Sequence, residues 1–142
     1  MMENIFLRTE ALFGNEAVNK LKNSKILIFG LGGVGSYAAE ALARSGVGKI
    51  LLVDSDVVSR SNINRQLCAL QSTVGRYKVD VIAERLLDIN PDIIIEKHYG
   101  FVLPENISDF SFDKFDYVID AIDTVSAKLA IAESANAHGV PM

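Results

Sequence analysis

The stretch SRSNINRQL, residues 59–67, brings together the polar side chains of Asn62, Asn64, Arg65 and Gln66. It comes shortly after an apolar run that ends in Asp54. An arginine presents a planar fork of N–H donors that matches two phosphate oxygens at once. Cations of this kind also stabilise the negative charge that develops when a phosphorus atom is attacked. The stretch therefore predicts a site where the phosphates of a nucleotide are attacked, with Arg65 as part of the chemistry.

A glycine-rich segment upstream, GLGGVG at residues 30–35, fits the pattern G-x-G-x-x-G. In this pattern Gly30 permits a tight turn, Gly32 lets a phosphate approach the backbone, and Gly35 lets a helix pack closely on a strand. The free N–H groups and the dipole at the start of the following helix attract an anion. Asp54 lies 24 residues after Gly30, where a carboxylate accepts hydrogen bonds from ribose hydroxyls of NAD, FAD or ATP. The alternative for the GLGGVG segment is a glycine-rich turn without a ligand, and the alternative for Asp54 is a solvated acid at the end of a strand.

The residues around this loop favour a reactive triphosphate over a bound dinucleotide. A hydride-transfer enzyme needs no cation near the phosphates beyond cofactor binding, whereas an adenylating enzyme needs cations and a metal at the α-phosphate. Lys78 follows Arg65 by thirteen residues, close to an expected helix start. Asp123 comes just after an expected strand and has the oxygen ligands that Mg²⁺ prefers. Taken singly, Arg65 and Lys78 are also explained as surface charges, and Asp123 as a helix N-cap.

These residues need a scaffold in which strands and helices alternate. Two short helices broken at Gly14 are expected within residues 3–24. Short apolar runs predict strands, and segments of helical period or rich in alanine predict helices. We expect strands at 25–30, 49–54, 92–100 and 116–123, and helices at 34–46, 78–90 and 124–139. The alternation is typical of an α/β fold, a Rossmann-like parallel sheet with helices on both faces.

The last residues, VPM at 140–142, read as the beginning of a fifth strand. The fold is therefore expected to be truncated at that strand, as the N-terminal part of a longer polypeptide. This gives two regions, an N-terminal helical segment at 1–24 and a Rossmann-like ATP-binding domain at 25–142 that is incomplete at its C-terminus.

The composition is that of a globular protein, with 49% hydrophobic and 23% charged residues. The net charge of −4 argues against a general nucleic-acid-binding surface but leaves room for a local basic patch. One cysteine, Cys68, excludes an internal disulfide and fits a reducing compartment. No segment has the apolar length of a signal peptide or of a membrane span, which predicts a cytoplasmic protein without a membrane partner.

Four segments in order carry a resemblance to a known family: GLGGVGSYAAEALARSGVGKILLVDSD, SNINRQ, VGRYKVDVIAERLLDINP and DYVIDAIDT. They resemble the ThiF–MoeB–HesA superfamily of ATP-dependent adenylating enzymes, which are relatives of ubiquitin-activating enzymes. RTEALFG at 8–14 and DAIDTVSAK at 120–128 are most similar to one branch, the tRNA threonylcarbamoyladenosine dehydratases. Enzymes that activate ubiquitin-like proteins usually read D-x-T-D-N where this chain has DAIDT.

The resemblance implies an activity and a set of site residues. The dehydratases use ATP to activate the threonyl carboxylate of the modified adenosine at position 37 of tRNA, and ring closure then gives the cyclic form. By motif position, ATP would contact Gly33, Asp54, Asn62, Arg65 and Lys78. Asp123 would hold Mg²⁺. Members of the family are homodimers, and an arginine near the N-terminus, here Arg8, would reach the ATP of the partner subunit.

The sequence leaves three alternatives open. The first is adenylation of the C-terminal Gly-Gly of a ubiquitin-like sulfur carrier, as in thiamine or molybdopterin biosynthesis. The second is a Rossmann module that binds NAD, against which Arg65 argues. The third is a non-catalytic fragment that only dimerises. Chains of the family are about twice as long as this one, and the region that would carry zinc-binding cysteine pairs or a catalytic cysteine is not among these residues.

Overall fold

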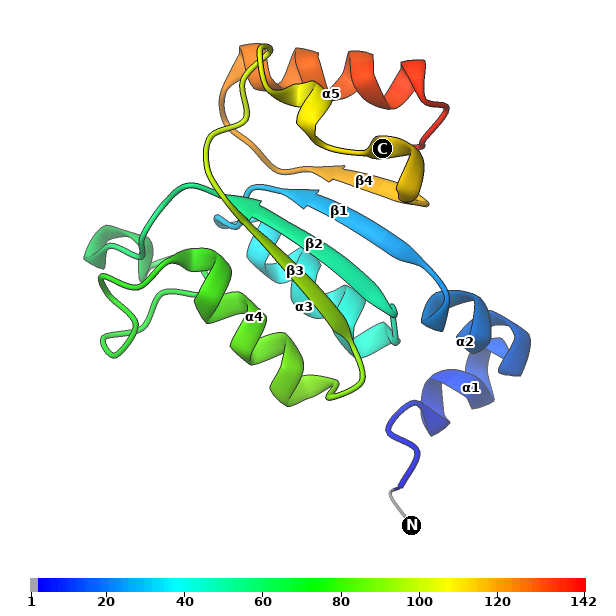
Figure 1. Cartoon of the computed structure of the whole chain (residues 1–142). Coiled ribbons are helices and arrows are strands. Elements are labelled where there is room, and N and C mark those ends of the chain that lie inside the picture. The colour runs from blue at the N-terminus through cyan, green and yellow to red at the C-terminus, as the bar shows by residue number, and fades with distance from the viewer. Residues whose placement is uncertain (1–2) are drawn as a thin grey trace.

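The computed structural model describes residues 3–142 and contains one parallel sheet of four strands (Figure 1). The strands are β1 (Lys25–Phe29), β2 (Lys49–Asp54), β3 (Ile94–Tyr99) and β4 (Tyr117–Asp120). The helices are α1 (Leu7–Phe13), α2 (Asn15–Lys22), α3 (Gly35–Ser45), α4 (Lys78–Ile89) and α5 (Val125–Ala137). Short 3₁₀ turns lie at Arg60–Asn62, Ile107–Asp109 and Phe112–Lys114. The alternation of strands and helices confirms the α/β, Rossmann-like fold.

The strand order β3-β2-β1-β4 indicates where a ligand could bind to the sheet. β1 pairs in parallel with both β2 and β4, so the chain leaves β1 on one side and returns on the other. Ligands of open parallel sheets bind at this point of reversal, beyond the carboxyl ends of the strands. Here those ends are Phe29, Asp54 and Asp120, and the glycine-rich segment follows directly after β1.

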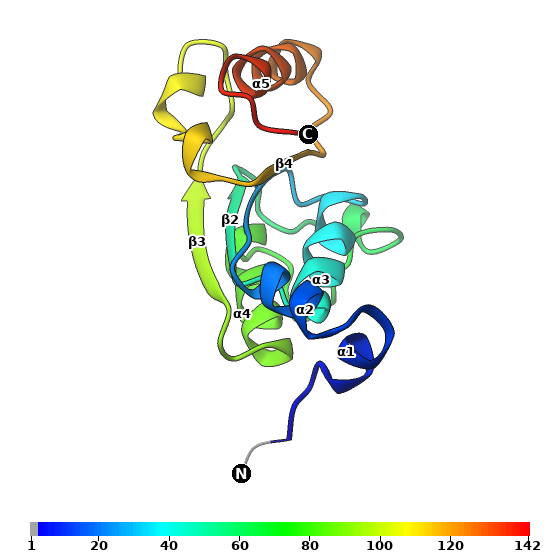
Figure 2. The ribbon, with the colours of Figure 1, turned by 90° about the vertical axis from the view of Figure 1, so that its right-hand side faces the viewer.

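Helices cover both faces of the sheet (Figure 2). On one face, Ile26, Ile28, Ile50 and Leu52 pack against α3 and α4. On the other face, Leu27 and Phe29 pack against α5 and against the turns around Phe110 and Phe112. Alternate strand residues therefore enter different cores, because successive side chains of a strand point to opposite faces. Burial on both faces explains why β1 and β2 read as continuous apolar runs, whereas β3 at the edge of the sheet has no buried residue.

Helices α3 and α4 end close to the residues predicted from the sequence. Gly46 adopts φ +97° after α3, a left-handed conformation that glycine takes without a steric penalty. α4 ends at Ile89, directly before Asn90 and Pro91, because the residue before proline is disfavoured in a helix. The helices at 35–45 and 78–89 differ from the predicted bounds by only one residue at either end.

The first residues of the described chain agree with the predicted helices, whereas residues 140–142, predicted to begin a fifth strand, form no strand in the structure. Two helices separated by Gly14 precede β1, and neither contains a buried residue. The division into 1–24 and 25–142 stays a prediction. At the other end, the N–H of Val118 in β4 donates to the carbonyl of Pro141, so residues 140–142 begin to align with the free edge of β4. Within residues 3–142, no helix has the length and apolar character needed to cross a bilayer.

Candidate functional site

The glycine-rich segment forms a tight loop between β1 and α3. Gly30 has φ +91°, and a Cβ built there would lie 2.5 Å from the carbonyl oxygen of Ala121. A Cβ on Gly35 would lie 1.7 Å from the carbonyl oxygen of Gly30. Both positions therefore exclude a side chain, because the loop folds back on itself and on the segment that follows β4. These contacts confirm the steric roles predicted for Gly30 and Gly35.

Gly32 and Gly33 face a different environment. A Cβ on Gly32 would meet only the side chain of Gln66, at 3.4 Å from its Nε2 atom. A Cβ on Gly33 would meet the Arg65 side chain at 3.6 Å or more. These two glycines leave their backbone accessible from the pocket, and the polar groups of the 59–67 stretch stand opposite them. The two motifs therefore line one pocket, and their action on a single ligand stays a prediction.

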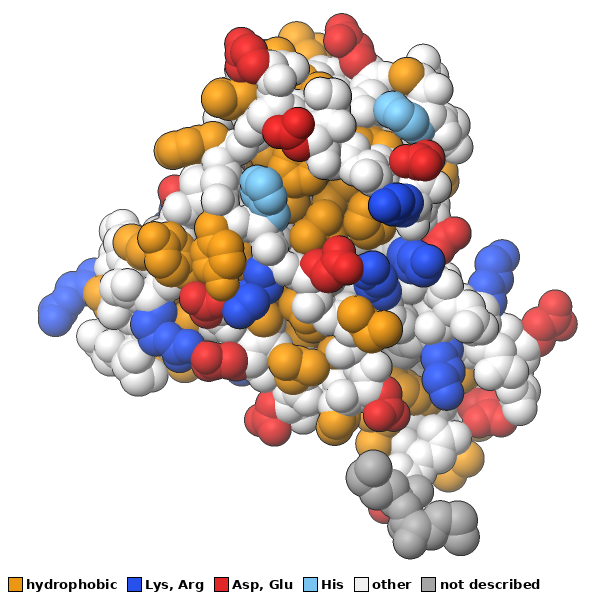
Figure 3. All heavy atoms as spheres, in the orientation of Figure 1, with side chains coloured by type: hydrophobic (Ala, Val, Ile, Leu, Met, Phe, Trp, Pro, Cys, Tyr) orange, Lys and Arg blue, Asp and Glu red, His pale blue; other side chains and the backbone are white. Residues whose placement is uncertain are grey.

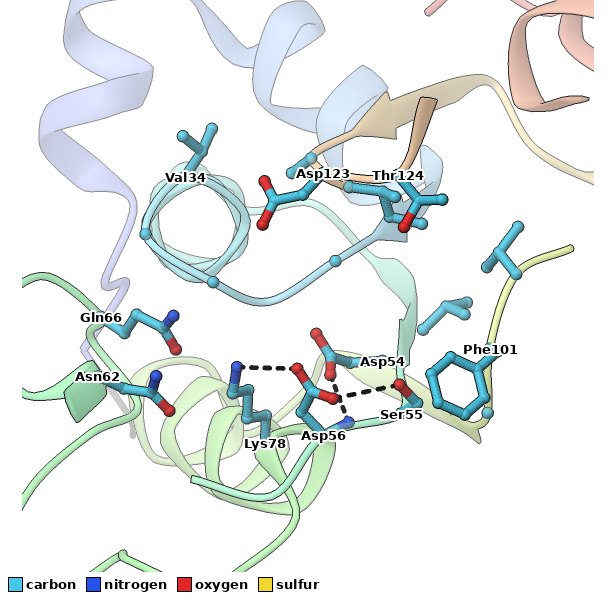
Figure 4. A pocket seen from close by; sticks show the side chains of 18 of the residues that line it. Val34, Asp54, Ser55, Asp56, Asn62, Gln66, Lys78, Phe101, Asp123 and Thr124 are labelled. Atoms are coloured by element: carbon cyan, nitrogen blue, oxygen red, sulfur yellow. Dashed lines mark hydrogen bonds and ion pairs between the residues drawn. The ribbon is translucent and has the colours of Figure 1, made fainter. Parts of the chain in front are cut away.

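A pocket of about 560 Å³ opens at this edge of the sheet (Figure 4). Its volume lies within the range of small-molecule sites in proteins. Four segments form its walls: the glycine loop, residues 53–56 after β2, residues 100–102 after β3, and residues 121–124 after β4. Asn62, Arg65, Gln66 and Lys78 close it on the remaining side.

Asp54 has two backbone partners at the end of β2. Its Oδ2 accepts a hydrogen bond from the Leu31 N–H at 2.8 Å, and its Oδ1 accepts one from the Asp56 N–H at 2.7 Å. The carboxylate thereby fixes the glycine loop relative to β2. A carboxylate accepts about four hydrogen bonds, so two acceptor positions remain for ribose hydroxyls.

Lys78 is the first residue of α4 and is buried, with 5% of its surface exposed. Its ammonium group lies 3.4 Å from the Asp56 carboxylate, whose side chain is largely exposed at the pocket wall (Figure 4). Burying a cation is unfavourable unless it is paired. The position and the pairing exclude the reading of Lys78 as an ordinary surface charge, and they aim a cation at the pocket.

The 59–67 stretch is held in place by its own hydrogen bonds. In the turn Arg60–Asn62, the Asn62 Oδ1 accepts from the Ser59 N–H, which is the reciprocal arrangement of a capping box. The Arg65 Nη1 donates to the Ser61 carbonyl at 3.0 Å and to the Asn64 Oδ1 at 2.9 Å. Arg65 is therefore oriented by uncharged acceptors. It has no carboxylate partner among the described residues and keeps its charge available to an anion.

Asp123 lines the pocket across from Lys78, between β4 and α5 (Figure 4). The N-cap of α5 is Thr124, without a side-chain cap bond, so the alternative reading of Asp123 as the N-cap is wrong. Within residues 3–142, the Asp123 carboxylate has neither a hydrogen bond nor an ion pair, and no group of three or more His, Cys, Asp or Glu side chains gathers to hold a metal. Mg²⁺ is commonly bound by one or two carboxylates together with substrate phosphates, and a single free carboxylate fits that mode.

Two predicted site residues, Gly35 and Arg8, do not line this pocket, and Gly35 instead packs against the Gly30 carbonyl behind the loop. Arg8 lies on a different part of the chain. It is exposed on α1, which precedes the amino end of β1, whereas the pocket lies beyond the carboxyl ends (Figure 1). Arg8 therefore contacts no part of this chain's own pocket. Its predicted role toward the nucleotide of a second subunit stays a prediction.

Sequence reasoning gave no role to several residues of the pocket. Gln66 is buried against Gly32, and its Oε1 atom lies 3.7 Å from the thiol of Cys68. Burial raises the pKa of the Cys68 thiol, as expected for a structural rather than a reactive cysteine. Phe101 and Ile122 give one end of the pocket an apolar surface. Gln66 was readable as the neighbour of Arg65, but the apolar end depends on how three separate loops meet.

Comparison with known proteins shows the family to which this chain belongs. The ThiF family matches residues 6–142. The chain belongs to the ThiF family. The tRNA threonylcarbamoyladenosine dehydratase of Bacillus subtilis is 47% identical over 137 residues, which are 96% of this chain and 54% of that protein. The adenylyltransferase and sulfurtransferase uba4 of Emericella nidulans is 37% identical over 130 residues, 92% of this chain and 27% of that protein.

Solved structures of the family share the fold of this chain closely. The crystal structure of the Escherichia coli tRNA N6-threonylcarbamoyladenosine dehydratase superposes with a TM-score of 0.94 at 42% identity, covering 96% of this chain and 57% of that one. A structure of the same enzyme in complex with ATP gives 0.93 at 42% identity, covering 96% and 56%. This ThiF-family chain thus spans about half the length of the dehydratases it matches.

Proposed function

We propose that this chain binds ATP in the pocket at the carboxyl edge of the sheet and adenylates a carboxylate. One observation carries the proposal: the open backbone of Gly32 and Gly33 faces Arg65 and the buried Lys78 across a single pocket. Backbone N–H groups at the start of a helix and two cations form a site for a polyphosphate.

The pocket has a polar end and an apolar end, which orients the nucleotide. The triphosphate lies along the glycine loop, within reach of Asn62, Arg65 and Lys78. The ribose hydroxyls donate to Asp54, which retains two acceptor positions after its bonds to the backbone. The base then occupies the apolar end at Phe101 and Ile122. The ATP complex of the Escherichia coli dehydratase, a relative of the same fold, supports this choice of ligand.

Asp123 is the residue that would hold Mg²⁺. Its carboxylate faces the pocket without a partner among the described residues, opposite the phosphate-binding loop. When bound, Mg²⁺ neutralises charge on the phosphate oxygens. Lys78 and Arg65 supply positive charge from this chain itself, each from a fixed position in the pocket wall.

The reaction is the attack of a carboxylate oxygen on the α-phosphorus of ATP. The bond between that phosphorus and the bridging oxygen of pyrophosphate breaks, which gives an acyl adenylate and pyrophosphate. Arg65 stabilises the charge that develops on the phosphate oxygens. In the proposed substrate, the threonylcarbamoyl group at position 37 of tRNA, a nucleophile of the same side chain then attacks the acyl carbon, expels AMP and closes the ring.

The relatives favour tRNA as the acceptor over a sulfur carrier. The dehydratases of Bacillus subtilis and Escherichia coli are 47% and 42% identical to this chain, whereas uba4 of Emericella nidulans is 37% identical. The Gly-Gly terminus of a ubiquitin-like sulfur carrier is the second candidate, since it presents a carboxylate to the same chemistry.

Two parts of the proposal concern the assembly. We propose a homodimer in which Arg8 reaches the nucleotide of the second subunit, because Arg8 is exposed and distant from its own pocket. A substrate made of tRNA places the protein in the cytoplasm, where tRNA and ATP are available.

Exchange of labelled pyrophosphate into ATP tests the proposed activity. Because adenylation is reversible, the exchange requires the carboxylate substrate and the enzyme together. We expect exchange with tRNA that carries threonylcarbamoyladenosine and none with unmodified tRNA. Exchange that depends instead on a peptide ending in Gly-Gly would favour the second candidate, and NAD binding in place of ATP binding would overturn both.

A further inference from the structure

Positive charge is concentrated in one segment beside the pocket. Residues 57–79 contain four of the fourteen Lys and Arg residues of the chain and none of its eighteen Asp and Glu residues. We call residues 57–79 the basic segment. Arg65 and Lys78 are the two cations that line the pocket, and both come from this segment. The other four segments that form the walls carry no cation, and two of them carry the acids Asp54, Asp56 and Asp123. A polyanion that approaches the pocket is therefore attracted to the side of the basic segment.

Arg60 carries a further positive charge of the basic segment, outside the nucleotide pocket. It is exposed at the start of the 3₁₀ turn Arg60–Asn62 and does not line the pocket, whereas Asn62 in the same turn does. Arg76, in the same segment, is already paired with Glu84. Arg60 forms no ion pair with any carboxylate in the part of the chain that the structure describes, so its charge is uncompensated.

Two exposed aromatic rings lie at the end of the basic segment. Tyr77 and Tyr99 are each 48% exposed, and their ring centroids are 5.2 Å apart in an edge-on arrangement. The ammonium group of Lys97 lies 5.8 Å from the centre of the Tyr99 ring. Its charge is paired with the Asp80 carboxylate, which also accepts a hydrogen bond from the Tyr99 hydroxyl. Neither ring lines the pocket, which uses Phe101 instead. Figure 3 shows hydrophobic side chains beside Lys and Arg side chains over the carboxyl end of β3.

We propose that the basic segment, together with Tyr99, binds an unpaired loop of RNA and presents it to the ATP pocket. This inference rests on the proposed function, because it names the surface that holds the acceptor. Arg60 contacts a backbone phosphate, and the faces of Tyr77 and Tyr99 stack on bases that flank the reacting nucleotide. Proteins recognise single-stranded RNA by this combination of cations and aromatic stacking. A net charge of −4 is compatible with it, because the cations are local.

Fluorescence anisotropy with an anticodon stem-loop RNA, in the absence of ATP, tests the surface. We expect Arg60→Glu to weaken RNA binding about tenfold at low salt and to reduce the slope of log affinity against log salt by about one. Tyr77→Ala should also weaken binding about tenfold, with a smaller change in the salt slope, because stacking is not ionic. The matched control is Lys20→Glu, which makes the same change of charge on an exposed residue of α2 at the opposite edge of the sheet. It should bind RNA as the unmodified chain does.

Calorimetric titration with ATP and Mg²⁺ separates this inference from the proposed function. Arg60 and Tyr77 lie outside the nucleotide pocket, so both variants should bind ATP with unchanged affinity. Failure of the unmodified chain to bind ATP would contradict the proposed function, while the RNA measurement would still decide the surface. Absence of RNA binding by the unmodified chain, or equal binding by Arg60→Glu, would overturn the inference. So would a loss of affinity in Arg60→Glu for a peptide ending in Gly-Gly but not for RNA.

Discussion

At the scale of single residues, the partners of each charged group distinguish site residues from ordinary surface charges. Arg65 and Lys78 are both cations of the same pocket, but Arg65 is oriented by uncharged acceptors and Lys78 is buried beside Asp56. Burial of an ammonium group is costly, so its placement at the wall of a polar pocket points to an anionic ligand. Asp123, without a partner among residues 3–142, is the residue that we propose for binding a cation.

Replacement of Arg65 tests whether this residue stabilises the negative charge that develops on the phosphate in the transition state. Arg65→Ala should lower the rate of adenylation about 100-fold or more, because the donor acts on charge that develops during the reaction. The melting temperature should hardly change, since the side chain is exposed and bonded only to nearby groups. Pyrophosphate exchange with the full substrate measures the rate. Turnover equal to that of the unmodified chain would remove Arg65 from the chemistry.

Replacement of Asp123 tests the metal site. Among the described residues, Asp123 is the one pocket carboxylate without a partner. Asp123→Ala removes it, so ATP binding should lose its dependence on Mg²⁺. Calorimetric titrations with ATP, each with and without Mg²⁺, measure the difference. If the variant still binds ATP more tightly with Mg²⁺ to the same extent, the metal is held elsewhere.

At the scale of elements, two glycines of one loop should respond differently to substitution. In Gly32→Val the new side chain meets only the Gln66 side chain, so the fold should persist while ATP binding is lost sterically. In Gly35→Ala the new Cβ would overlap the Gly30 carbonyl, so unfolding should become easier by about 2 kcal/mol or more. Thermal unfolding and ATP titration of both variants distinguish the two effects. Normal ATP affinity in Gly32→Val would reject the loop as the phosphate site.

Glu40 links α3 to α4 and provides a pH-dependent prediction. Its carboxylate accepts from Arg85 of α4 and from Arg44 of its own helix, and the hydrogen bond from Arg85 lowers the Glu40 pKa below its usual range. A carboxylate with a lowered pKa stabilises the fold above its unfolded pKa and loses that contribution as the pH falls through the folded value. Glu40→Gln should therefore destabilise the chain by about 1 kcal/mol at pH 7. The two chains should converge in urea unfolding as the pH falls below about 4, and a constant difference would contradict this account.

The elements were largely predictable because each has a local cause. Apolar runs predicted the four strands, and Gly46 and Pro91 predicted the ends of α3 and α4. Which loops meet in space was harder to predict from the sequence. The Gly30 turn against Ala121 and the apolar end at Phe101 arise only when segments distant in sequence meet at the carboxyl edge of the sheet.

At the scale of the whole molecule, the sheet accounts for why these residues act together. The reversal of strand order beside β1 leaves a space beyond the strand ends, and the glycine loop, Asp54, Lys78 and Asp123 all border it. The chain spans about half of the dehydratases it matches, so the acceptor, the homodimer and the role of Arg8 are proposals about the larger assembly. The basic segment belongs to both the pocket and the outer surface, since it supplies two cations to the nucleotide pocket and Arg60 to the surface.

Calorimetric titration of this chain with ATP and Mg²⁺, and separately with NAD, tests the central claim most directly. Both ligands suit a Rossmann-like sheet with a glycine loop and an acid at the end of β2. The cations Arg65 and Lys78 opposite the loop predict binding of ATP without measurable binding of NAD. Binding of NAD without ATP would contradict the account and return the chain to the dinucleotide-binding class.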